Sequence, residues 1–223
     1  MTIIGKALFP VTTKKDGKNV FGGICSFVVS LTPPSGANFI RIGHLLWTTP
    51  NLFADVNTVA GLLSAVNVAM GSWPASLYDP GVYPPIYTYV VDSTYESTGS
   101  VVTVPIHGAS LGLAATIASM GFMPENYAFT GFEQSVAAAT RKRGNLRIHR
   151  IDELKIKAAG VAALGNITLI CPVESDAPPG VLQCRTLKDV LTILEKDGVK
   201  TFPTLHFNEA APLRKRIRNE GSS

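Results

Sequence analysis

The stretch that decides the fold is SVVTVPIHGASLGLAATIASMGF, residues 100–122, in which a β-rich segment gives way to an apolar helix. The residues 100–106 predict a strand, and Ser110–Phe122 predict a helix of small apolar residues. At the junction, Ser110 has a glycine two residues away on either side, and the next polar side chain is Thr116. A serine at a helix start faces free backbone N–H groups and the positive end of the helix dipole.

This setting suits a nucleophilic serine. Glycine lets a substrate backbone approach closely, and the backbone at Gly108, Ala109 and Ser110 is the candidate to bind the oxyanion of a tetrahedral intermediate. The same setting suits a plain N-cap, a role in which serine is common. A single G-x-S-x-G pattern does not separate the two, so nucleophile and cap both stay open from this segment alone.

A second predicted helix, Ile151–Leu164, carries a lysine in its apolar stripe. The residues that share this face are Leu154, Lys157, Ala158, Val161 and Leu164. A free lysine is charged at neutral pH, but burial among apolar groups penalises the ammonium and favours the neutral amine. Lys157 is therefore a candidate general base for Ser110.

Two alternatives to a buried Lys157 stay open. Glu153 lies four residues before Lys157, and such a pair is typical of a solvated helix surface. Lys155 is a rival base, with Asp152 within a turn as a partner. Asp152 and Glu153 are both expected in the first turn of the helix, where the dipole favours carboxylates.

The remaining pattern alternates strands and helices, which predicts an α+β (α/β-like) fold with helices packed on a sheet. Two strands form a predicted hairpin with a long turn, Gly22–Leu31 and Asn38–Trp47. The further strands are Ile86–Val91, Tyr127–Thr130 and Ile167–Pro172, and the further helices are Leu52–Met70 and Thr186–Asp197. Gly165 is expected to end the helix of Lys157, and Thr186 with Asp189 forms an imperfect capping box.

The composition favours one soluble domain. The chain has 223 residues, 46% of them hydrophobic and 16% charged, enough apolar material for a substantial core. We expect a single domain over residues 1–205 and a flexible tail over 206–223. No apolar run reaches the roughly 20 residues that span a bilayer, and the first 21 residues lack the order of a signal peptide. A cytoplasmic location is the expectation.

Cysteine, histidine and basic residues offer competing chemistry. Cys25, Cys171 and Cys184 have no C-x-x-C spacing, so buried reduced thiols are expected rather than disulfides or a metal site. A classical triad would need one of the four histidines, and His107 is near Ser110 in sequence; we assign it a structural or substrate-lining role. The formal net charge of +4 gathers at 141–150 and 214–218, which leaves a non-catalytic RNA-binding or assembly module as the alternative function.

The two key segments together resemble the proteolytic domain of Lon-type proteases. That family has its nucleophile in D-G-P-S-A-G at the start of an apolar helix, where this chain has His107–Gly112. The family's A-M-T-G-E corresponds to Ala128–Phe132. Its P-I-G-G-L-K-E-K-L corresponds to Arg150–Ala158, and the second lysine of that motif is Lys157. Ile167–Pro172 is similar to the strand that follows in the family.

The departures from the family pattern are specific. The acidic residue and the proline before the serine are missing, Asp152-Glu153 replaces the glycine pair, and the interval from Thr130 to Lys157 is longer. There is no Walker A motif and no room for an ATPase domain. In these respects the chain resembles the ATPase-free Ser-Lys proteases of birnaviruses, which cleave a viral polyprotein and release themselves from capsid precursors.

The resemblance implies a Lon-protease-type fold, with mixed β-sheet hairpins packed against several helices and no ATPase domain. It implies a serine endopeptidase with Ser110 as nucleophile, Lys157 as base and Thr130 as the residue whose hydroxyl holds the lysine amine. The implied partner is a polypeptide bound as an added β-strand. No cofactor, metal, membrane or nucleic acid is required, and the sequence leaves the oligomeric state open.

Overall fold

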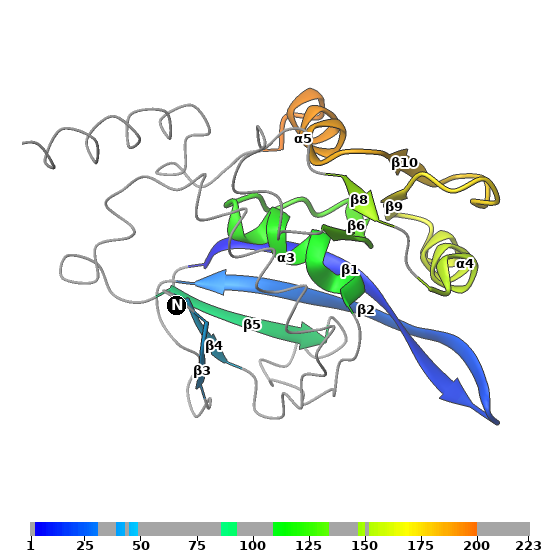
Figure 1. Cartoon of the computed structure of the whole chain (residues 1–223), viewed down its shortest axis with the longest axis horizontal. Helices are drawn as coiled ribbons and strands as arrows, with labels where there is room; N and C mark the ends of the chain where they lie inside the picture. Colours follow the sequence, from blue (N-terminus) through cyan, green and yellow to red (C-terminus); the bar gives the residue numbers. More distant parts are fainter. Residues whose placement is uncertain are drawn as a thin grey trace, which may run out of the picture.

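The computed structural model describes residues 3–30, 39–42, 45–48, 86–92, 109–133, 147–149 and 152–199. The predicted helix Leu52–Met70, the predicted strand 100–106 and most of the basic segment 141–150 lie outside the described residues, as does everything after residue 199. Within the described part, strands and helices combine in a mixed α/β arrangement (Figure 1). This agrees with the class that the sequence predicts.

Eight strands of the described part form one mixed sheet, in the order β10-β9-β6-β1-β2-β5-β4-β3. Their bounds are β1 Ile3–Lys15, β2 Lys18–Ser30, β3 Phe39–Ile42, β4 Leu45–Thr48, β5 Ile86–Asp92, β6 Tyr127–Phe129, β9 Thr168–Pro172 and β10 Leu182–Cys184. β1, β6, β9 and β10 run parallel to one another, and β1 pairs with β2 in an antiparallel hairpin. A separate pair joins β7, Phe132–Glu133, to β8, Ile148–His149.

The β1–β2 hairpin is the longest feature of the sheet and reaches beyond the other strands (Figure 1). Asp16 and Gly17 turn the chain with φ values of 51° and 74°. Positive φ at both central residues is the type I′ geometry whose twist matches the flanking strands, and Asp-Gly is one of its preferred sequences. A strand over residues 3–15 is not among the elements predicted from the sequence, although an Asp-Gly pair between lysines is a hairpin signal.

The predicted hairpin between Gly22–Leu31 and Asn38–Trp47 is wrong. β2 pairs with β1 on one side and with β5 on the other. Residues 38–47 do not form one strand, because β3 and β4 are two short strands that pair with each other. The strand predicted at Ile86–Val91 is confirmed as β5, whose neighbours are β2 and β4.

Helices cover both faces of the sheet, because side chains on successive strand positions point to opposite faces. On one face, Ala7 and Phe9 of β1 share a core with α3, Gly112–Ser119, and α5, Leu187–Lys196. On the other face, Leu8 shares a smaller core with α4, Leu154–Leu164. A 3₁₀ turn, η2, spans Ala109–Leu111 and leads into α3.

The helix of Lys157 begins three residues later than the sequence predicts. Glu153 precedes α4 with a left-handed backbone, φ 64°, which costs a residue with a Cβ about 1–2 kcal/mol. Asp152 and Glu153 therefore lie before the first turn rather than in it. At the other end Gly165 stops the helix with φ 77°, as predicted. Leu164 is 47% exposed, so it is not part of the buried face.

Two further expectations concern the last third of the chain. Thr186 caps α5 with a complete capping box, since its hydroxyl accepts from the Asp189 N–H while the Asp189 carboxylate accepts from the Thr186 N–H. β10 was not predicted from its three residues. Within the described residues, no helix is long and apolar enough to cross a membrane.

The contact between β1 and α3 gives the first prediction. A Cβ on Gly5 would lie 1.8 Å from the backbone oxygen of Ala118, and backbone cannot swing aside. We expect Gly5→Ala to lower the free energy of unfolding by about 1–3 kcal/mol, measured by urea denaturation. The control is Gly22→Ala, whose Cβ would meet Thr13 at 3.4 Å, an ordinary contact. Equal stability of the two variants would contradict the packing described here.

Candidate active site

The starts of α3 and α4 meet at the end of β6, although the two helices lie on opposite faces of the sheet. The Gly131 N–H, just beyond β6, donates to the Ser110 carbonyl at 3.0 Å, and the Gly131 carbonyl accepts from the Leu113 N–H at 3.1 Å. These bonds hold η2 against the end of β6. The carboxyl ends of parallel strands are the usual place for a site in a sheet covered by helices.

Ser110 and Lys157 meet at this edge. The Lys157 Nζ donates to the Ser110 Oγ at 3.1 Å, a bond between residues 47 positions apart in the chain. Lys157 is only 5% exposed. Its neighbours on the buried face of α4 are Leu154, Ala158 and Val161. The Lys157 side chain is thus buried among apolar residues, and its Nζ is directed at the Ser110 hydroxyl.

Burial favours the neutral form of this amine. Desolvation lowers the pKa of Lys157 below its usual value of 10.5, while the carboxylates of Glu153 and Asp152 pull the pKa in the opposite direction. The net direction is downward, because the loss of hydration on burial disfavours the ammonium more than the attraction of the two carboxylates favours it. The neutral amine is therefore more easily formed at Lys157 than at a surface lysine.

The alternatives for these two residues are decided by the geometry. α3 has Leu111 at its N-cap position and no side-chain cap bond, so Ser110 is not the cap of that helix. Glu153 does not pair with Lys157, since its carboxylate accepts from the Thr12 hydroxyl and the Asn19 amide. Lys155 is 69% exposed and forms an ion pair with Asp176 at 2.9 Å, rather than with Asp152 as expected.

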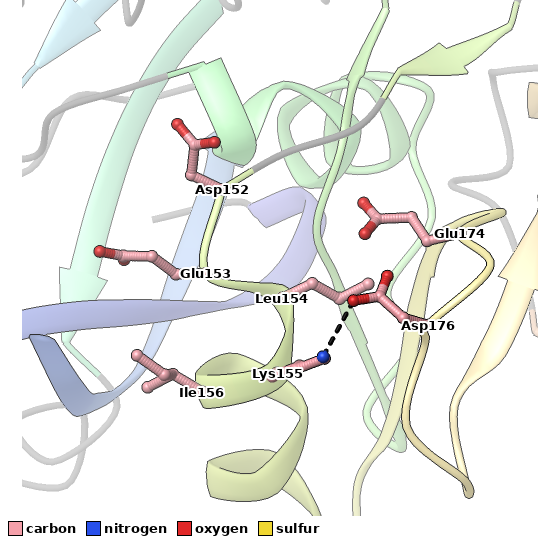
Figure 2. Close-up of a pocket in the computed structure, with 7 residues that line it drawn as sticks. All are labelled: Asp152, Glu153, Leu154, Lys155, Ile156, Glu174 and Asp176. Carbon is pink, nitrogen blue, oxygen red and sulfur yellow. Dashed lines mark ion pairs between the residues drawn. The ribbon is translucent and has the colours of Figure 1, made fainter.

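A cavity of about 280 Å³ opens beside the start of α4 (Figure 2). It contains the Lys155–Asp176 ion pair and is lined by Asp152, Glu153, Leu154, Lys155, Ile156, Glu174 and Asp176. Neither Ser110 nor Lys157 is in the lining. The cavity lies on the solvated side of the helix start, so it is distinct from the buried contact between amine and hydroxyl.

Thr130 lies in the first position after β6. Its N–H donates to the Ile170 carbonyl at 3.0 Å and so continues the ladder with β9. The Thr130 side chain is fully buried, and its Oγ1 has no hydrogen-bond partner among the described residues. A bond from Thr130 to the Lys157 amine, as the resemblance implies, is therefore not formed in this structure. A buried hydroxyl without a partner costs about 1–3 kcal/mol.

The other predicted site residues are placed as follows. Ala109 belongs to η2 with Ser110, whereas Gly108 and His107 lie outside the described residues. The exposed His149 is on β8, and the remaining histidines lie outside the described part. Among the described residues, no group of three or more histidine, cysteine, aspartate or glutamate side chains could hold a metal ion.

The cysteines are buried and free, as the sequence predicts for all three. Burial is the main cause that raises the pKa of Cys171 to about 12 and the pKa of Cys184 to about 11. A thiol must ionise to act as a nucleophile. Cys171 and Cys184 are therefore poor nucleophiles at physiological pH.

Exchange of Lys157 for an apolar side chain of similar length tests its burial. The lowered pKa means that the unfolded chain binds more protons than the folded one between the two pKa values, so stability rises with pH up to about 10.5. We expect Lys157→Met to raise the free energy of unfolding by about 1–3 kcal/mol at neutral pH. The gain should shrink as the pH rises toward 10.5. A gain that does not change with pH would contradict a buried amine.

No protein-family model matches the chain, and no curated protein matches it either. Among solved structures, the chain is similar to one described as a novel viral protease with a serine/lysine catalytic dyad mechanism. The identity is 13%, the match covers 87% of this chain and 86% of that one, and the TM-score is 0.47. At these values the likeness identifies neither family nor reaction, so the function has to be argued from the Ser110–Lys157 geometry.

Proposed function

We propose that the protein is a serine endopeptidase with a Ser-Lys catalytic dyad. The observation that carries the proposal is an amine that is 5% exposed and lies 3.1 Å from the Ser110 hydroxyl. A general base has to lie within hydrogen-bond reach of the proton it removes and have a pKa near the working pH. Lys157 meets the distance requirement, and its burial moves the pKa in the required direction.

The proposed reaction has two stages. In the first, the neutral Lys157 Nζ takes the Ser110 proton while Oγ bonds to the carbonyl carbon of the scissile peptide. Backbone N–H groups at Gly108, Ala109 and Ser110 hold the oxyanion. The Lys157 ammonium then protonates the leaving amine, and the acyl-enzyme forms. In the second stage Lys157 removes a proton from water, the hydroxide attacks the ester, and Ser110 regains its proton.

Thr130 is proposed to steady the amine during this proton transfer. Alternation along β6 directs Ala128 toward α4, and Thr130, two residues further along the same extended ladder, lies on the same side. Its buried hydroxyl has no partner among the described residues. In the proposed cycle this hydroxyl accepts a hydrogen bond from the Lys157 ammonium once the amine has taken the proton.

The finer assignment rests on the resemblance alone. We propose a Lon-type protease domain over residues 1–205, active in the cytoplasm of a host cell, that cleaves a viral polyprotein and releases itself from capsid precursors as birnavirus proteases do. The support is the order of the Ser110, Thr130 and Lys157 segments along the chain. A polypeptide substrate would bind as an added strand, which supplies backbone hydrogen bonds without a deep pocket.

The experiment that tests the proposal is incubation of the full chain with a proteome-derived peptide library, followed by mass spectrometry of the products. New peptide ends at recurrent positions are the expected result, and none in the Ser110→Ala variant. A precursor with natural flanking sequence tests self-release in the same way. Absence of cleavage, together with RNA binding that weakens steeply with salt, would contradict the protease and favour the non-catalytic RNA-binding module.

A further inference from the structure

We infer that the β1–β2 hairpin acts as a latch on the general base, and that Glu153 is a positioning residue for Lys157. The inference rests on the proposed function, because it concerns the base of that reaction. Both carboxylate oxygens of Glu153 are bound by the hairpin, Oε2 by the Thr12 hydroxyl and Oε1 by the Asn19 amide. Thr12 belongs to β1 and Asn19 to β2, so both strands hold one carboxylate.

Glu153 is well placed to control where Lys157 lies. Its left-handed backbone, φ 64°, sets the direction in which α4 begins. Its carbonyl accepts from the Lys157 N–H at 3.1 Å, so a backbone hydrogen bond joins Lys157 to the residue that precedes the helix. A shift of Glu153 moves Lys157 with it. The bond from Nζ to the Ser110 Oγ is 3.1 Å long, which leaves little room before the base loses contact with the hydroxyl.

A second contact holds α4 on the far side of Lys157. A Cβ on Gly160 would lie 2.1 Å from the ring of Phe21 in β2, so the helix backbone approaches that ring as closely as glycine permits. Glu153 before Lys157 and Gly160 after it thus join α4 to the same hairpin. The hairpin braces the helix along the segment that carries the base.

The latch also sets where the negative charge of Glu153 lies relative to the Lys157 amine. A glutamate four residues before a lysine normally pairs with it on a helix surface, and such a pair would hold Lys157 in its charged form. Here two uncharged donors occupy the carboxylate and turn it toward the hairpin. The Lys157 amine is left with the Ser110 hydroxyl as its partner.

Among the described residues, the charged groups that act on the pKa of this amine are the carboxylates of Glu153 and Asp152. Asp152 at the start of α4 acts on Lys157 in the same direction as Glu153. On the elements packed against α4, β1 presents Lys6 on the same face as Leu8, and β9 contributes the Cys171 thiol, neutral with a pKa of about 12. The hairpin therefore acts on the pKa of Lys157 by setting the position of the Glu153 carboxylate.

Two variants move the charge state of Lys157 in opposite directions. Thr12→Val combined with Asn19→Ala releases the carboxylate, which then pairs with Lys157 and raises the midpoint of its titration. Glu153→Gln removes the carboxylate and lowers the midpoint. Asp152→Asn is the charge control, which lowers the midpoint without touching the latch. The midpoints are read from the ¹³Cε chemical shift of Lys157 in the full chain, assigned by its loss in Lys157→Met.

The latch should also affect kcat, because it holds Lys157 in position beside Ser110. Release of the latch should lower kcat on the alkaline plateau by about 10- to 100-fold, because small displacements of a catalytic group have effects of this size. Asp152→Asn should leave the plateau unchanged. If the double variant does not fold, Thr12→Val alone replaces it.

The two proposals fail separately. Midpoints that do not move, or that move the same way in the latch-release and Glu153→Gln variants, overturn the latch even if Ser110→Ala shows that the protease is real. A wild-type chain that cleaves nothing overturns the protease, while the midpoints still test the latch.

Discussion

Ser110→Ala and Lys157→Met each lower kcat/KM by about 10⁴- to 10⁶-fold, the range found when a member of a catalytic unit is removed. In the proposed reaction, Ser110→Ala removes the oxygen that forms the acyl-enzyme. Lys157→Met keeps the length of the side chain and its packing beside Leu154 and Ala158 but removes the lone pair that takes the proton. The rate is measured on a peptide found in the library experiment.

The matched control for this loss is Lys155→Met. Lys155 is two residues away on the same helix, but it is 69% exposed and paired with Asp176, and exposed pairs contribute little. Its removal should leave kcat/KM unchanged. Both active-site variants should melt cooperatively, and Lys157→Met should melt at a higher temperature than the wild type. Cleavage by Lys157→Met at the wild-type rate would show that Lys157 is not the general base.

The second large effect is on the pH profile. Below the pKa of Lys157, kcat/KM falls about tenfold for each unit of pH, because one proton on the amine blocks the base. Burial lowers this pKa from 10.5, so activity rises toward alkaline pH and levels off before a surface lysine would have titrated. The profile is measured with the peptide substrate and compared with that of Lys155→Met, which should coincide with it.

A different profile would identify a different base. Lys157 lies among apolar side chains, and the carboxylates of Glu153 and Asp152 keep its pKa from falling further. A rise centred near the ordinary pKa of histidine that persists in Lys157→Met would indicate an imidazole. A flat profile between pH 6 and 10 would contradict a titrating base altogether.

The contact between serine and lysine could be predicted because each residue interrupts a strong local pattern. Lys157 occupies a position between Leu154, Ala158 and Val161 that the helical period directs inward. A charged side chain in such a stripe is uncommon, because lysine is rarely buried without a partner. Ser110 likewise lies just before a helix of mostly small apolar residues, in which every residue from Gly112 to Ser119 is buried. The order of the two segments along the chain, together with the family resemblance, then predicted that Ser110 and Lys157 act as a pair.

The partners of the strands could not be predicted in the same way. The apolar run of β2 predicts a buried strand, but it does not identify the neighbours of that strand. One neighbour, β5, lies much further along the chain, and the other, β1, precedes β2 across a two-residue turn. The long β1 strand was missed because its turn, Asp16-Gly17, was not read as a hairpin signal. Without that hairpin, the hydrogen bonds from Thr12 and Asn19 to Glu153 could not be predicted either, because the two donors lie on either side of the turn.

The start of α4 shows a third kind of error. Asp152 and Glu153 satisfy the rule for carboxylates in a first turn, yet Glu153 has φ 64° and precedes the helix. The family that the segment resembles has a glycine there, and glycine adopts this conformation without cost. In this chain the Glu153 side chain accepts two hydrogen bonds from the hairpin, from Thr12 and Asn19.

Acylation of Ser110 tests the central claim most directly. The full chain is mixed with a small activated ester, quenched in acid, digested and analysed by mass spectrometry. We predict an acyl group on Ser110 in the wild type and in Lys155→Met, and none in Lys157→Met within the same time. An acyl group on another residue, or equal acylation of Ser110 in Lys157→Met, would contradict a serine activated by the buried amine.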